Sequence, residues 1–181
     1  RYIGDWSSDV CSSDLAENDR IFNAVFVLDD GKKIARRDKV NLPNYGVFDD
    51  KRNFTAGGMP GPVMLRGIKF GLPICEDIWQ ADVAECLQES GADILLALNA
   101  SPFDSAKPER RMSTAVARTV ETGLPLIYVN MVGGQDELVY DGASFALNAD
   151  GSLASHLPSF SETVLQVQLV ETAGHIKLSG Q

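Results

Sequence analysis

Residues 71–79 read GLPICEDIW, and this stretch decides the fold because a strand-like run ends at a cysteine before a helix-like run begins. The preceding residues, 66–74, predict a strand. Residues 78–90 predict a helix that ends before Gly91. A chain that changes from strand to helix at Cys75 presents its thiol at the carboxyl end of the strand, where α/β folds bind ligands.

The alternation of strands and helices continues on both sides of this stretch. We predict strands over residues 21–28, 32–40, 94–98, 125–130, 144–148 and 164–170, and a helix over 108–122. Residues 41–61 predict a long ordered loop, which is often functional, and residues 133–134 a glycine-rich loop. Strands that alternate with helices of this length predict an α/β sheet with helices packed on it.

Composition limits the class of protein and of partner. The 181 residues suit one domain, with 44% hydrophobic residues and a formal net charge of -9. Such an acidic chain is unlike a nucleic-acid binder, which needs clustered basic residues. No apolar run approaches the roughly 20 residues that cross a bilayer, and no signal-peptide pattern is present. Three scattered cysteines form no disulfide framework or metal site, so we expect a cytoplasmic protein.

The first residues have a different character from the rest. Residues 1–15 read RYIGDWSSDVCSSDL, a Ser/Asp repetition without the period of a helix or strand. We interpret this segment, with its Cys11, as adaptor or vector sequence of non-native origin. Residues 16–181 are then expected to form a partial domain.

Two of the cysteines require separate interpretations. The backbone N–H groups after Cys75 can stabilise a thiolate or a developing oxyanion, although a buried structural cysteine has the same local pattern. Cys86 lies inside the predicted helix and is interpreted as structural. A protease-like cysteine-histidine pair is disfavoured, because His156 and His175 lie among the last 26 residues without an Asn or Asp constellation. Lys39 is the alternative partner, since a nearby cation lowers a thiol pKa.

Four motifs in one order carry a resemblance to a known family. They are KVNLPNYGVFDDKRNF (39–54), GLPICEDIW (71–79), NASPF (99–103) and VNMVGGQDELVYDGASF (129–145). Together they resemble the nitrilase superfamily, and within it the glutaminase domain of glutamine-dependent NAD+ synthetases. The resemblance covers roughly residues 16–170, and the last motif is the most specific to the synthetase branch.

The resemblance implies a fold, a triad and a substrate. The family has a four-layer α-β-β-α sandwich, which would be incomplete at the N-terminus of this chain, and a Glu-Lys-Cys triad. Cys75 matches the nucleophile and Lys39 the triad lysine. The positions that match contacts with glutamine are Tyr45, Phe48, Asp50, Glu76, Ser101, Lys107 and Arg111. Arg110, which is not in this set, competes with Arg111 for the same role.

One triad position has no match. Glu17 is the only glutamate before Lys39, and its setting, LAENDR, does not resemble the family's glutamate motif. We therefore expect the general base to be missing and the chain to release little ammonia from glutamine. The family implies no metal and no cofactor in this domain. ATP and Mg²⁺ belong to a C-terminal synthetase domain, whose phosphate-binding loop the sequence lacks, and complete relatives are expected to form homo-oligomers.

Two other functions remain open at this point. The first is another nitrilase-type enzyme, such as a carbamoylase, an aliphatic amidase or an ω-amidase, with the same fold and triad. The second is a non-catalytic nitrilase-like scaffold. The run GGQDELVYDGASF favours the synthetase branch, and the presence of both Cys75 and Lys39 favours an enzyme.

Overall fold

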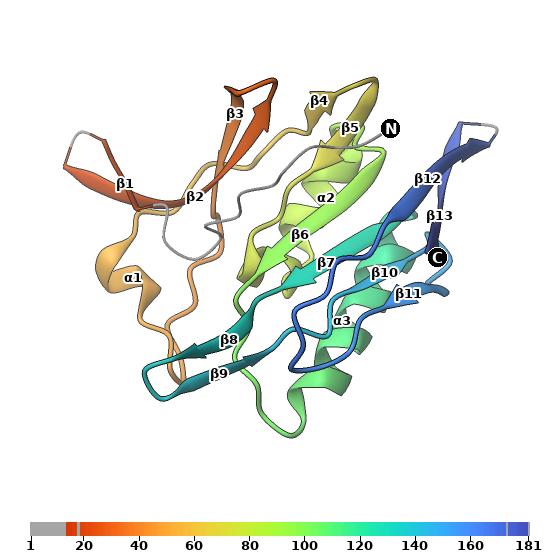
Figure 1. Ribbon diagram of the computed structural model, residues 1–181. Coiled ribbons are helices and arrows are strands. Elements are labelled where there is room, and N and C mark those ends of the chain that lie inside the picture. The colour runs from red at the N-terminus through yellow and green to blue at the C-terminus, as the bar shows by residue number, and fades with distance from the viewer. Residues whose placement is uncertain (1–13, 18, 173, 181) are drawn as a thin grey trace.

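A computed structural model of the protein describes residues 14–17, 19–172 and 174–180 (Figure 1). Most of the segment interpreted as foreign, residues 1–13 with Cys11, lies outside the described residues. Its last two residues, Asp14 and Leu15, belong to strand β1 (Asp14–Glu17), which pairs antiparallel with β2 (Arg20–Asp29). No helix in the described part of the chain is long and apolar enough to cross a membrane.

A six-stranded sheet forms the centre of the molecule, in the order β11-β10-β7-β6-β5-β4. Strands β5, β6 and β7 run parallel, whereas β4, β10 and β11 join antiparallel at the two edges. All six residues of β6 are buried, as in a strand covered on both faces. The bounds are β4 (Val63–Leu65), β5 (Ile68–Gly71), β6 (Ile94–Asn99), β7 (Leu126–Asn130), β10 (Phe145–Leu147) and β11 (Leu153–His156).

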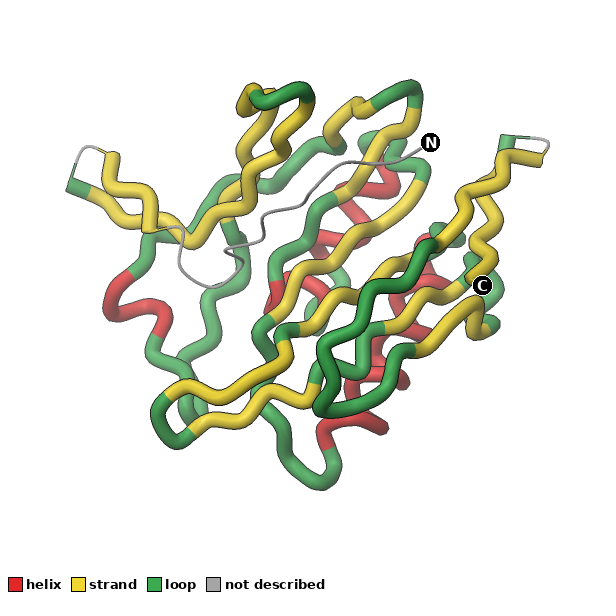
Figure 2. Tube along the Cα trace, in the orientation of Figure 1, coloured by secondary structure: helices red, strands yellow, loops and turns green. Residues whose placement is uncertain are grey.

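Two helices cover one face of this sheet (Figure 2). They are α2 (Asp82–Glu89) and α3 (Lys107–Thr122), which contact each other. Helix α3 has a proline in its first turn and ends at Gly123, which takes the left-handed conformation with φ of 66°. Val83 and Leu87 of α2 pack with Leu95 of β6 and Leu126 of β7.

Two β elements pack on the opposite face. One is the sheet of β1, β2 and β3 (Lys32–Asp38), and the other is the hairpin of β12 (Val167–Thr172) and β13 (His175–Gly180) (Figure 1). Val27 of β2, Leu178 of β13 and Leu96 of β6 share one buried cluster. The predicted α/β class is confirmed, and the sheet lies between a helical layer and a β layer.

The structure corrects several predicted elements. The strand expected over 66–74 is confirmed only as β5, because Arg66 and Gly67 form a left-handed turn with φ of 51° and 87° that joins β5 to β4, a strand that was not predicted. The helix expected over 78–90 begins only at Asp82, after the 3-10 turn η1 (Cys75–Ile78). The expected glycine-rich loop is a hairpin of β8 (Val132–Gln135) and β9 (Leu138–Asp141). A short helix, α1 (Asp50–Asn53), interrupts the long loop.

Candidate active site

Cys75 lies at the carboxyl end of the segment that continues β5. Ile74, the preceding residue, forms an isolated parallel bridge with Leu98 of β6, so the segment stays aligned with the sheet until the nucleophile position. Cys75 then begins η1 with a φ of 47°, in the left-handed region. A non-glycine residue in this region stores about 1–3 kcal/mol, and such strain is concentrated at functional sites. Its thiol is free and half-buried.

Lys39 follows directly after β3 and is almost fully buried. The residue is 4% exposed, and its Nζ atom lies 2.6 Å from Asp50 Oδ2. Its backbone N–H donates to Asn23 O at 2.8 Å, and its carbonyl accepts from Gly57 N at 2.8 Å. Gly57 must be small here, since a Cβ atom would lie 2.7 Å from Asp38 O. A buried ammonium with a single carboxylate partner is costly, which is typical of a functional position.

The charges around Cys75 act in opposite directions on its thiol. Burial is the largest effect and raises the pKa of Cys75. The ammonium groups of Lys39 and Lys107 lower this pKa, whereas the carboxylates of Glu76 and Asp50 raise it. Cys75, Lys39 and these three predicted substrate contacts therefore share one electrostatic environment. Cations beside a thiol favour the thiolate, and a base that takes the thiol proton is the further requirement of a nucleophile.

Tyr45 fixes the carboxylate of the residue after the nucleophile. Its hydroxyl donates to Glu76 Oε2 at 2.9 Å and lies 3.0 Å from Oε1. Burial and then this carboxylate raise the pKa of Tyr45. The ring of Phe48 packs edge-on at 5.8 Å between centroids. Tyr45 and Glu76 also line a cavity of about 780 Å³, together with residues 40–44 and 80–82.

Lys107 begins α3 and reaches toward the same site. Its Nζ atom lies 4.7 Å from the centre of the Trp79 ring, a cation–π contact that holds the flexible side chain. Arg110, one turn further, pairs with exposed Asp104 at 2.9 Å and lowers the pKa of Tyr45. Lys107 therefore acts on the Cys75 thiol, and Arg110 acts on the Tyr45 hydroxyl.

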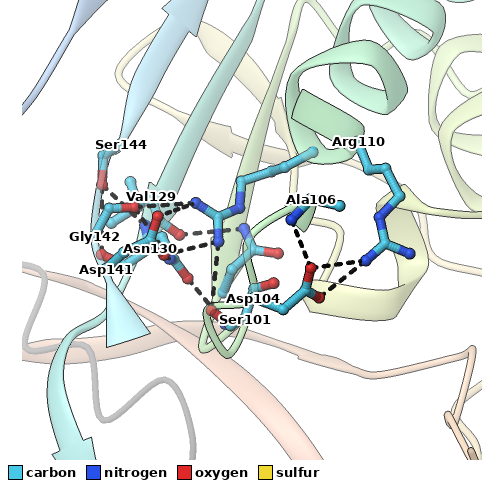
Figure 3. Close-up of polar contacts among 11 residues, drawn as sticks. Ser101, Asp104, Ala106, Arg110, Val129, Asn130, Asp141, Gly142 and Ser144 are labelled. Atoms are coloured by element: carbon cyan, nitrogen blue, oxygen red, sulfur yellow. Dashed lines mark hydrogen bonds and ion pairs between the residues drawn. The ribbon is translucent and has the colours of Figure 1, made fainter. Parts of the chain in front are cut away.

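Arg111 occupies a different environment from the other predicted contacts. Its guanidinium is 2% exposed and forms two bonds, at 2.9 and 3.1 Å, with the fully buried Asp141, which Figure 3 labels beside Asn130 and Gly142. It also donates to the carbonyls of Gly142 at 3.4 Å and Ser101 at 3.5 Å. The Arg111 guanidinium therefore donates to other residues of the protein and supports the segment that carries Ser101.

Ser101 is the predicted contact with unused hydrogen-bonding capacity. It is 2% exposed, and its backbone N–H donates to Asn130 Oδ1 at 2.9 Å. Its buried hydroxyl lies beside the buried Tyr128 hydroxyl and lowers the pKa of that phenol, and neither group meets a further hydrogen-bond partner within the described part of the chain. A hydroxyl has one donor and two acceptor sites, so this pair keeps hydrogen-bonding capacity for a bound polar molecule.

Sequence reasoning missed three residues that hold this arrangement together. Asp141 and Asn130 support the Ser101 segment through long-range contacts, and Asp77 bonds to the segment after Lys39. Asp77 lies two positions after Cys75 in the same motif, so its place in the sequence was a usable signal. Asp141 lies 30 residues from Arg111, and no local pattern indicates their pairing.

Comparisons with known proteins identify the family of the chain. The sequence model of the carbon-nitrogen hydrolase family matches residues 4–177. The glutamine-dependent NAD(+) synthetase of Rhodobacter capsulatus is 49% identical over 148 residues, which are 82% of this chain and 27% of that protein. The enzyme of the same name from Acinetobacter baylyi is 42% identical over 78% of this chain and 26% of its own length. The chain therefore spans about a quarter of these relatives.

Solved structures show the same similarity in three dimensions. Glutamine-dependent NAD+ synthetase from Acinetobacter baumannii superimposes with a TM-score of 0.78 at 41% identity, over 82% of this chain and 28% of that chain. A carbon-nitrogen hydrolase from Helicobacter pylori gives 0.72 at 26% identity, over 79% and 55%. An amidase of the nitrilase superfamily from Nesterenkonia gives 0.67 at 27% identity, over 76% and 52%.

Proposed function

The chain belongs to the carbon-nitrogen hydrolase family, and we propose that it is the glutaminase part of a glutamine-dependent NAD+ synthetase. The single observation that carries this proposal is the buried Lys39 ammonium, whose charge lowers the pKa of the Cys75 thiol and whose chain segment is tied through Asp77 to the residue before Cys75. The nitrilase fold is shared with other amidases, but the curated relatives at 42–49% identity bear the synthetase name and favour this branch.

The first chemical step is the attack of Cys75 Sγ on the side-chain amide carbon of glutamine. A carbon–sulfur bond forms, and the carbonyl oxygen takes the negative charge. The Lys39 ammonium and the Glu76 backbone N–H are the donors that would stabilise this oxyanion. Loss of one such donor typically lowers the rate by about 10²–10³.

The second step breaks the carbon–nitrogen bond. The proton taken from the thiol by the general base passes to the leaving nitrogen, and ammonia departs while a thioester remains on Cys75. Water, activated by the same base, then attacks the thioester and releases glutamate. The free thiol is restored, so the cycle consumes one water for each glutamine.

The general base is the part of this mechanism that the described residues do not supply. The two carboxylates that raise the pKa of Cys75, Asp50 and Glu76, are each engaged, by Lys39 and by Tyr45. Glu17 forms an exposed ion pair with Arg36. We therefore propose that a glutamate outside the described residues acts as the base, and that this chain alone has little glutaminase activity.

Recognition of glutamine follows from the charges of its α-amino and α-carboxylate groups. The Glu76 carboxylate, held by Tyr45, is suited to the α-ammonium, and Lys107 to the α-carboxylate. Phe48 forms an apolar wall beside Tyr45, and the Ser101 hydroxyl has free hydrogen-bonding capacity. We assign Asp50 to the support of Lys39.

The partners proposed for this domain follow from the same relatives. The released ammonia would be consumed by a C-terminal synthetase domain that uses ATP and Mg²⁺ to convert deamido-NAD+ to NAD+. No metal or cofactor is proposed for the glutaminase domain itself. Assembly into a homo-oligomer is part of the same proposal.

Covalent labelling tests the function directly. A chain extended to the length of its relatives is treated with an electrophilic glutamine analogue, and each cysteine is examined by peptide mass spectrometry. We expect one adduct, on Cys75, which glutamine suppresses and Cys75→Ala abolishes. Cys86→Ala is the matched control and retains the adduct. Undiminished ammonia release by Cys75→Ala would show that the proposed nucleophile is wrong.

A further inference from the structure

Asp77 is a buried carboxylate that the proposed chemistry does not use. It is 1% exposed and lies two positions after Cys75, within the turn η1. Its Oδ1 accepts the backbone N–H groups of Val40 at 3.1 Å and Asn41 at 2.7 Å. Its Oδ2 accepts the N–H of Ile74 at 3.0 Å. All three donors are backbone groups.

The positions of these three donors relate Asp77 to the active site. Val40 and Asn41 directly follow Lys39, and Ile74 directly precedes Cys75. Lys39 directly follows β3 of the β1-β2-β3 sheet, whereas Cys75 directly follows Ile74, which is bridged to the six-stranded sheet. One carboxylate therefore joins the two chain segments that carry the ammonium and the thiol.

Burying the Asp77 carboxylate costs free energy, which is typical of a residue with a specific role. Burial raises the pKa of Asp77 to about 6, and the three backbone N–H groups oppose this rise. Burying a carboxylate is unfavourable unless hydrogen bonds replace its lost water. Lys39 also lowers the pKa of Asp77, so the ammonium lies within electrostatic reach of both the thiol and this carboxylate.

We propose that Asp77 is a positioning residue that fixes the Lys39 ammonium next to the Cys75 thiol by holding the backbone on either side of them. The inference rests on the proposed function, in which these two groups act together. Asp77 itself does not contact substrate in this proposal. It acts only through the placement of its neighbours.

The sign of one measurement separates this role from two others. Asp77→Asn keeps the shape of the side chain. Its amide NH2 is a donor, however, so at least one of the three backbone N–H groups faces a donor and loses its acceptor. If Asp77 positions Lys39, the pKa of Cys75 rises in the variant, because the cation that lowers it moves away. A purely electrostatic role predicts a lower pKa, since a negative charge is removed. A purely structural role lowers the melting temperature and leaves the thiol unchanged.

The experiment measures the rate of Cys75 alkylation by iodoacetamide against pH, with peptide mass spectrometry to separate the cysteines. It needs no glutaminase activity and uses the 181-residue chain as it is. We expect Asp77→Asn to slow alkylation at neutral pH by roughly threefold to tenfold, which corresponds to about half to one pKa unit. Asp93→Asn is the matched control, because its carboxylate also accepts a backbone N–H, that of Lys69 at 2.7 Å, but near the start of β5 and away from Cys75. It should leave the rate unchanged.

Two further variants keep the outcome decisive. Lys39→Met gives the effect of losing the ammonium completely. If Lys39→Met leaves the thiol pKa unchanged, the proposed pairing of Cys75 and Lys39 fails. If Lys39→Met raises it but Asp77→Asn does not, only the positioning role fails. Should Asp77→Asn not fold, Asp77→Glu keeps the charge but displaces it, and an unchanged thiol pKa in that variant overturns the inference.

Discussion

The buried pair of Arg111 and Asp141 gives the sharpest prediction about stability. The two side chains are 2% and 0% exposed and meet through two parallel bonds of 2.9 and 3.1 Å. Asp141→Leu would leave the guanidinium buried without its anion. Breaking a buried pair from one side costs about 3–5 kcal/mol. Carbonyls of Ser101 and Gly142 remain as partners, so we expect a loss near the lower end, about 3 kcal/mol.

Urea unfolding at neutral pH, followed by the fluorescence of half-buried Trp79, measures this loss. We expect Asp141→Leu and Arg111→Met each to lower the free energy of unfolding by about 3 kcal/mol, a large fraction of the 5–15 kcal/mol of a typical domain. The double variant should lose far less than the two single losses together, because it leaves no unpaired charge. Arg110→Met breaks an exposed ion pair with Asp104 and is the matched control, with no measurable change expected.

Two results would refute this reasoning. One is a loss below about 1 kcal/mol for either single variant. The other is a double variant whose loss in the free energy of unfolding equals the sum of the two single losses. The same set of proteins, extended to active length, also tests the role of Arg111. If Arg111 contacts glutamine, as the resemblance implied, the double variant loses affinity for glutamine even though its fold is restored.

Three further predictions follow from other contacts. Gly57→Ala should destabilise the protein by about 1–3 kcal/mol, because the new Cβ would lie 2.7 Å from Asp38 O, whereas Gly58→Ala meets no atom within 4 Å and serves as its control in thermal unfolding. The pKa of Asp77, raised from 3.8 to about 6, adds stability that is complete below about pH 4 and is lost as the pH rises through 6. The unfolding free energy of the wild type relative to Asp77→Asn should therefore fall by up to about 3 kcal/mol between pH 4 and 7, and a constant difference would contradict the raised pKa. Tyr45→Phe removes the hydroxyl that holds the carboxylate after the nucleophile, so KM for glutamine in an active-length chain should rise about tenfold while kcat changes little, and an unchanged KM would exclude this role.

Local patterns predicted much of the fold. The proline in the first turn of α3 and Gly123 after its end marked both bounds of that helix. The continuous apolar run of β6 indicated a strand buried on both faces. Each of these signals lies within the element that it describes, so the sequence alone was sufficient.

Other features depend on contacts that local patterns do not contain. The left-handed backbone at Arg66 places a turn where the predicted strand begins, although arginine is not a usual turn residue. The helix after Cys75 begins late because Asp77 caps the intervening 3-10 turn through its bond to Ile74. The pairing of Arg111 with Asp141 brings together α3 and β9, which lie far apart in the sequence, so no local pattern indicates it.

The structure of the covalent adduct tests the central claim most directly. A chain of active length would be crystallised after reaction with an electrophilic glutamine analogue that keeps its carbonyl oxygen. The account predicts a bond to Cys75 Sγ, with that oxygen about 2.7–3.2 Å from both Lys39 Nζ and the Glu76 backbone nitrogen. An adduct whose oxygen contacts neither donor would contradict it.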